Sequence, residues 1–129
     1  MDNYLDAKQE IRQRIEDTLE SKGLLIQRRN RKIQPNPSDR WGRVTFTNTS
    51  SHSAELGQLW LRDRGFITVD IFFPLNTGTG EIDPLAIEIR DTFTEYTYNY
   101  LELGVGTIND VPTTLDYFHV HVILPFRHK

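Results

Sequence analysis

The chain has 129 residues and a formal net charge of −3 at pH 7, a length that fits one domain over residues 1–129. It contains no cysteine, which excludes disulfides, cysteine-bound zinc and thiol catalysis. The N-terminal segment is charged throughout and no apolar run reaches the ~18 residues of a membrane span. We therefore expect neither a signal peptide nor a membrane protein.

The first predicted element is an amphipathic helix over residues 3–22. Gly23 is placed to end this helix, because glycine readily adopts the conformation that closes a last turn. The helix prediction depends on apolar residues that recur at spacings of three and four, namely Tyr4, Ala7, Ile11, Ile15 and Leu19.

The next segments alternate between strand-like and polar sequence. Residues 24–27 allow a short strand, whereas the charged, proline-containing segment 28–40 is predicted to be a mobile loop. Residues 41–49 alternate apolar and polar side chains, which indicates a half-buried strand. Residues 50–55 are polar without an apolar anchor, and we expect a second mobile loop over residues 49–57.

A strand, a glycine-containing turn and a helix follow in that order. Residues 58–74 are strand-like, with Ile67, Val69, Ile71 and Phe73 on one face, and residues 81–96 are predicted to form the second helix. The turn at residues 75–80 resembles a phosphate-binding loop only superficially. Glu81 and Asp83 follow it and would repel a phosphate, and no lysine follows it.

The C-terminal third is predicted to hold strands at residues 100–108 and 116–126, separated by a turn at 109–114. Consecutive strands suit antiparallel hairpins, and two amphipathic helices can cover one face of a sheet. The predicted fold class is therefore α+β, with a mainly antiparallel sheet of about four to five strands and both helices packed on one face.

The sequence offers few residues for chemistry. His119 and His121 share one face of the last strand and could reach one metal ion if Asp70 or Glu102 completed the ligand set. Two exposed histidines without a metal are the favoured interpretation. There is no G-x-S-x-G motif and no carboxylate pair that can be placed in a pocket. We expect no enzymatic activity, no cofactor and no metal.

Charge is distributed unevenly along the chain. Residues 22–43 carry a net charge of +6, and residues 81–116 carry a net charge of −7. Opposite charges of this kind can join copies of one protein, so the interface candidates are Arg28, Arg29, Arg31, Lys32, Arg40, Arg43, Glu81, Asp83, Glu88 and Asp91. A different hypothesis is a nucleic-acid-binding module that uses the basic cluster at residues 28–32.

Residues 63–93 contain a strand similar to the pattern Gly-aliphatic-x-Val-Asp-Val-Phe-x-Pro, a loop that ends in Gly-x-Gly, and an alanine-containing helix. The pattern falls on Gly65, Ile67, Val69, Asp70, Ile71, Phe72, Pro74, Gly78, Gly80 and Ala86. A Gly-Val-Gly strand and a terminal Pro-Phe-Arg follow, at Gly104, Val105, Gly106, Pro125, Phe126 and Arg127. This combination resembles the bacteriophage tail terminator family, also called tail-completion proteins.

The resemblance implies a structural virion protein with an α+β fold. Tail terminators form a hexameric ring that caps the tail tube, stops its growth and joins it to the head-completion proteins of the neck. The implied partners are further copies of the chain, the tail tube protein and a head-completion protein, with genomic DNA passing through the ring without specific binding. The implied location is the head-proximal end of the virion tail, after assembly in the host cytoplasm. Another head–tail connector or a tail-tube component is the alternative within this class.

Overall fold

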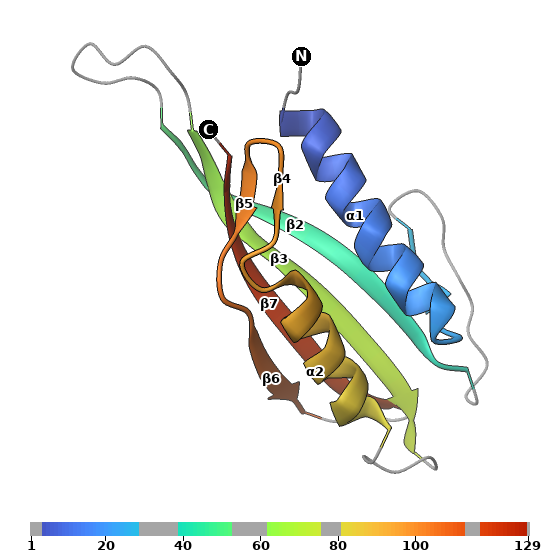
Figure 1. Ribbon diagram of the computed structural model, residues 1–129. Coiled ribbons are helices and arrows are strands. Elements are labelled where there is room, and N and C mark those ends of the chain that lie inside the picture. The colour runs from blue at the N-terminus through green and yellow to red at the C-terminus, as the bar shows by residue number, and fades with distance from the viewer. Residues whose placement is uncertain (1–3, 29–38, 53–61, 76–80, 113–116, 129) are drawn as a thin grey trace.

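The computed structural model describes residues 4–28, 39–52, 62–75, 81–112 and 117–128 (Figure 1). These residues form two helices and one seven-stranded sheet. The elements in chain order are α1 (Tyr4–Ser21), β1 (Leu25–Ile26), β2 (Trp41–His52), β3 (Arg62–Pro74), α2 (Ile82–Phe93), β4 (Thr97–Tyr98), β5 (Leu101–Leu103), β6 (Thr107–Val111) and β7 (Tyr117–His128).

Three long strands, β2, β3 and β7, form the centre of the sheet and pair antiparallel over most of their length. The strand order is β1-β2-β3-β7-β5-β4, and β6 also pairs with β7. The far side of β7 is shared, because β6 pairs with residues 119–123 and β5 with residues 126–128. β1 runs parallel to β2, so the sheet is mixed.

Both helices lie on the same face of the sheet (Figure 1). One hydrophobic core joins the inward side chains of β3 and β7 to the apolar stripes of the helices. α1 contributes Ala7, Ile11, Ile15 and Leu19 to this core, and α2 contributes Ile82, Leu85, Ala86, Ile89 and Phe93. Among the described residues, neither helix is long and apolar enough to cross a membrane.

Two left-handed residues shape the turn from the helical layer back to the sheet. Glu95 has a φ of 57° directly after α2, and its backbone N–H donates to the Gly104 carbonyl at 3.0 Å. Asn99 has a φ of 53° between β4 and β5, where asparagine tolerates this conformation better than most residues. These turns place the β4–β5 hairpin against the end of β7.

The predicted fold class is confirmed as α+β, but the predicted sheet of four to five antiparallel strands is wrong. The sheet has seven strands among the described residues and is mixed. The short strand allowed at 24–27 is present as β1, whereas β4 was missed because its two residues give no measurable alternation. The single strand predicted at 100–108 is divided between β5 and β6. The predicted turn at 109–114 overlaps β6, whose residues 107–111 pair with β7.

The predicted element boundaries need smaller corrections. The second helix ends at Phe93, not at residue 96, because Thr94 already has an extended backbone (φ −64°, ψ 129°) and Glu95 a left-handed one. The loop predicted at 49–57 is wrong for residues 49–52, which extend β2; residues 53–57 lie outside the described residues. Of the other predicted loop, 28–40, the structure describes only residues 28, 39 and 40.

Pro125 lies inside β7, where its neighbour on the far side changes from β6 to β5. Its carbonyl accepts a hydrogen bond from the Gly104 N–H at 2.8 Å. In an antiparallel strand, the N and O of one residue point to the same neighbour. The ring nitrogen of Pro125 therefore faces the β5 side, and its missing N–H removes no hydrogen bond between β7 and β3.

Candidate functional site

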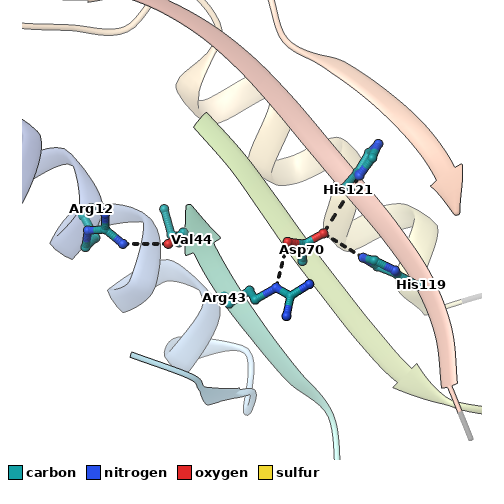
Figure 2. A network of polar contacts seen from close by, with 6 residues as sticks. All are labelled: Arg12, Arg43, Val44, Asp70, His119 and His121. Carbon is teal, nitrogen blue, oxygen red and sulfur yellow. Dashed lines mark hydrogen bonds and ion pairs between the residues drawn. The ribbon is translucent and has the colours of Figure 1, made fainter. Parts of the chain in front are cut away.

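The open face of the sheet, opposite the helices, carries a buried carboxylate in the middle of β3. Arg43 Nε donates a hydrogen bond to Asp70 Oδ2 at 3.0 Å, and His119 Nε2 lies 2.7 Å from Asp70 Oδ1. His121 Nδ1 lies 3.9 Å from the same Oδ1 atom. Figure 2 shows these three side chains converging on Asp70 from β2 and β7.

The strand register explains this convergence. Arg43 and His121 are the direct cross-strand partners of Asp70 on its two sides, and His119 is two residues from His121. Direct partners share one face of a sheet, and diagonal neighbours remain within reach of long side chains. Because Val69 and Ile71 enter the core, alternation directs Asp70 to the open face.

Asp70 is only 6% exposed, which makes its partners necessary. A buried carboxylate is costly unless charged or hydrogen-bonding groups replace the water that it loses. The guanidinium of Arg43 serves one oxygen, and a His119 N–H serves the other. The prediction of two exposed histidines is wrong for His119, whose side chain is 11% exposed, whereas His121 is 27% exposed.

Aromatic rings cover this carboxylate on the open face. Phe72 stacks on Trp41 with ring centroids 3.9 Å apart and on His119 with centroids 4.1 Å apart. Tyr117 meets both Trp41 and Phe72 edge-on, and the Arg43 guanidinium lies 5.5 Å from the centroid of Phe72. Stacked and edge-on rings of this kind add stability beyond their buried area. We call the whole group the open-face cluster: Trp41, Arg43, Asp70, Phe72, Tyr117, His119 and His121.

The sequence analysis identified both histidines and named Asp70 as one of two possible partners, but it missed the aromatic members. The indole Nε1 of Trp41 is buried and has no hydrogen-bond partner among the described residues. A buried donor without a partner costs about 1–3 kcal/mol. The packing of the indole ring on Phe72, not its N–H, therefore accounts for tryptophan at this position.

A second polar feature lies at the edge of the sheet, where β1 pairs with only residues 41–42 of β2. Arg12 of α1 donates a hydrogen bond to the Val44 carbonyl at 2.6 Å beyond that point (Figure 2). Its guanidinium also lies 5.0 Å from the centroid of the Phe46 ring. A groove of about 360 Å³ at this edge is lined by basic side chains, among them Lys8, Arg12, Arg28 and Arg43. Basic side chains therefore line this edge of β2, and two of them, Arg28 and Arg43, also form ion pairs within the chain.

Most of the described interface candidates form ion pairs within the chain. Arg40 pairs with Glu81, and Lys22 pairs with Glu88 at 3.2 Å. The basic segment 22–43 and the acidic segment 81–116 thus meet inside one molecule. These pairs connect α2 to the β1–β2 side of the fold.

The remaining candidates divide into three groups. Arg28 pairs with Glu20 and lies 3.6 Å from Glu16, Arg43 belongs to the open-face cluster, and Asp91 pairs with its neighbour Arg90. Asp83 is exposed in the first turn of α2. Arg29, Arg31 and Lys32 lie outside the described residues.

Glu16 is a buried charged residue on the helical side of the molecule. Burial raises the pKa of its carboxyl group, and the nearby guanidinium groups of Arg28 and Arg12 offset this increase only in part. The environment of Glu16 therefore makes its carboxyl group release the proton less readily than an exposed glutamate does.

Comparison with known proteins agrees with this architecture. A solved structure whose name carries no function superposes with a TM-score of 0.63 over 88% of this chain and 95% of the other, at 15% sequence identity. At that identity the likeness shows the fold alone. A search of the curated proteins found no match.

A comparison with family models shows which protein family the chain belongs to. The family model described as "Phage tail terminator protein" matches residues 8–120. The chain belongs to the phage tail terminator family. The match extends from α1 into β7 and includes every residue of the open-face cluster except His121. The resemblance found in the sequence is thereby confirmed.

Membership gives this terminator a structural role in the phage tail. The family is one of structural proteins that interact with other components of the tail, and its members are located in the virion. The open-face cluster and the basic edge of β2 are therefore candidate contact or binding surfaces of a tail protein.

Proposed function

We propose that this terminator forms a hexameric ring on the head-proximal end of the tail tube, where it stops tube growth and provides the surface for the head-completion protein. The observation that carries the proposal is the family match over residues 8–120. In this function the chain has no catalytic role, and DNA passes through the ring without specific contacts.

The shape of the sheet supports a ring. A closed ring of identical subunits needs two different surfaces on each subunit, because each contact joins one patch to another. The basic edge of β2 and the outer edge of β6 lie on opposite sides of the sheet (Figure 1). Unpaired strand edges also present backbone donors and acceptors to a neighbour.

The within-chain ion pairs refine the proposed contacts. Arg40, Glu81 and Glu88 already neutralise one another or Lys22 inside the protomer, so they contribute little net charge to a neighbour. Asp83 and the basic residues Arg29, Arg31 and Lys32 are the better candidates for contacts between subunits or with the tube.

The first test is the native mass of the purified chain over a series of protein and salt concentrations. We expect a discrete species near six times 15.1 kDa. Purified tail tubes are then added, and electron microscopy should show the protein at one tube end only, with elongation halted. Decoration along the tube would instead indicate a tube component, and failure to bind tubes would contradict the terminator function.

A double variant distinguishes the nucleic-acid-binding hypothesis from the ring proposal. Arg28→Ala combined with Arg29→Ala should leave tube-end binding in place if these residues serve DNA alone. Binding of short duplex DNA would then be lost, and the wild-type affinity would fall steeply with salt. We expect no such DNA binding, because Arg28 is paired with Glu20.

A further inference from the structure

We propose that Asp70, His119 and His121 form a binding site for a first-row transition metal ion on the open face of the sheet. The candidate ligand atoms are Asp70 Oδ1, His119 Nε2 and His121 Nδ1, and such atoms from the three residues lie within 4.8 Å of one another. The residues come from two neighbouring strands and point toward one another in Figure 2. The proposal does not depend on ring formation or on tube binding.

The positions of the ligand atoms are close to those that a metal requires. Metal bonds of about 2.0–2.2 Å to nitrogen and oxygen place the ligands of a tetrahedral ion about 3.4 Å apart. The distance from Asp70 Oδ1 is 2.7 Å to His119 Nε2 and 3.9 Å to His121 Nδ1. Shifts of less than about 1 Å would bring both of these distances into range. The two histidine ligand atoms lie at most 4.8 Å apart, so they would have to approach each other by no more than about 1.4 Å.

The strand pairing organises the site in advance. Asp70 and His121 are direct cross-strand partners in the β3–β7 ladder, so their backbones are held by the sheet. Arg43 binds Asp70 Oδ2 and leaves Oδ1 facing the histidines. Partners outside the ligand shell that orient a ligand in this way strengthen metal binding. Phe72 restricts the His119 ring by stacking on it.

The ligand set determines the class of ion. Two imidazoles and one carboxylate suit Zn²⁺, Co²⁺, Ni²⁺ or Cu²⁺, whereas Mg²⁺ and Ca²⁺ prefer oxygen ligands. His121 is the most exposed of the three ligands, so a water molecule or a partner side chain can occupy a fourth position from that side. The sequence analysis favoured no metal because it could not place a third ligand; the register supplies Asp70.

Metal binding must displace a proton. The contact between His119 Nε2 and Asp70 Oδ1 is a hydrogen bond in the metal-free protein. To bind a metal through Nε2, the neutral imidazole moves that proton to Nδ1, and a protonated imidazole releases one to solvent. Affinity is therefore expected to fall as the pH decreases through the range in which histidine is protonated.

The test uses the full-length chain without a purification tag, stripped with chelator and titrated with Co²⁺ while its visible absorption is recorded. We expect one Co²⁺ per chain, displacement by Zn²⁺, and a melting temperature about 5–10 °C higher at a Zn²⁺ concentration 100 times the Kd. His121→Asn and His119→Gln should each weaken binding at least tenfold. Asp110→Asn is the matched control, because Asp110 is exposed on the neighbouring strand β6.

His121→Asn keeps the test decisive even if other variants fold poorly, because His121 has the longest contact with Asp70 and is partly exposed. Far-ultraviolet circular dichroism of the metal-free variant confirms its fold. The proposal is overturned if the wild type shows no cobalt spectrum at a Co²⁺ concentration of about 10⁻⁴ M, a concentration at which even a weak specific ion site is partly occupied. Equal affinity of the wild type and His121→Asn would also overturn it.

Discussion

The two faces of the sheet differ in chemistry although the same three strands form both. On β3, the residues that point toward the helices are Ile67, Val69, Ile71 and Phe73, all fully buried and apolar. The alternate residues Asp70 and Phe72 are also buried, although no helix covers them. They are covered by side chains of the neighbouring strands. One face is therefore stabilised by packing under helices, and the other by a cross-strand polar and aromatic cluster.

This difference shows how an uncovered sheet face can hold a buried charge. Helices exclude water over a wide area, whereas Trp41, Phe72 and His119 exclude it only around Asp70. On the helix-covered face, stability should depend on how completely side chains fill the core. On the open face, it should depend on the ion pair and hydrogen bond of Asp70. Substitutions can test the two faces separately.

The largest expected effect is on the helix-covered face. Phe73→Ala removes a fully buried ring from the core and should lower the free energy of unfolding by about 3–5 kcal/mol. Thr68→Ala, on the open face of the same strand, should cost less than about 1 kcal/mol. Urea denaturation followed by circular dichroism measures both. Equal losses in the two variants would contradict the distinction between the faces.

On the open face, Asp70→Ala should lower the free energy of unfolding by about 2 kcal/mol. The loss is smaller than the 3–5 kcal/mol typical of a broken buried ion pair, because the Arg43 side chain is 44% exposed and can turn to water. Asp70→Asn keeps an acceptor for Arg43 and should lose less. The same denaturation assay compares the two variants, and a stable Asp70→Ala protein would show that the cluster depends on its rings alone.

Glu16 is an ionisable residue buried on the otherwise apolar inner face of α1. Its environment predicts that the stability of the protein depends on pH. Its pKa is raised above the ordinary 4.5, so the folded protein holds the proton more tightly than the unfolded chain. The stability contributed by protonation is present below pH 4.5 and is lost as the pH rises through the folded pKa. Glu16→Gln should therefore be more stable than wild type at pH 7, because the amide carries no charge to desolvate. That advantage should vanish below pH 4.5.

Glu20→Gln is the matched control for this pH effect, because Glu20 is on the same helix and also contacts Arg28, but its side chain is 47% exposed. Thermal melts from pH 4 to pH 8 compare the two variants. A Glu16→Gln protein that is less stable than wild type at pH 7 would mean that its contact with Arg28 outweighs the cost of burial.

The smallest effect on stability is expected for the surface ion pair between Lys22, which follows α1, and Glu88 of α2. A double-mutant cycle on Lys22 and Glu88 should give a coupling energy below about 0.5–1 kcal/mol, since both side chains are nearly half exposed. This coupling should decrease further in 0.5 M salt, because salt screens exposed charges. A coupling energy that is large and independent of salt would mean that this pair behaves like a buried ion pair and not like a surface one.

The sequence predicted the parts of the fold that have long, regular patterns. Helix α1 and the strands β2, β3 and β7 follow from apolar spacing. The residues of β3 that enter the core were placed together on one face, although the sequence did not say which face is buried. The two-residue strand β4 was not predicted, because pairing and not local pattern defines it. The parallel pairing of β1 with β2 likewise depends on where α1 places the chain.

The candidate site was predictable only in part for the same reason. Alternation put Asp70 and Phe72 on one face of β3, and His119 and His121 on one face of the last strand. Their convergence depends on the register between β3 and β7, which a single sequence does not specify. The stack of Trp41 on Phe72 requires the register of β2 as well. Family resemblance identified the protein's class without revealing this cluster.

The proline inside β7 has a consequence for how the chain finds that register. The ring nitrogen of Pro125 faces β5, so only in the observed register does its missing N–H remove no hydrogen bond between β7 and β3. A slip of β7 by one residue against β3 would turn that nitrogen toward β3, where a donor is needed. The same slip would move Val120 and Val122 out of the core and bring His119 and His121 into it. Pro125 thus penalises the misaligned sheet during folding and helps to select the alignment that gathers the histidines around Asp70.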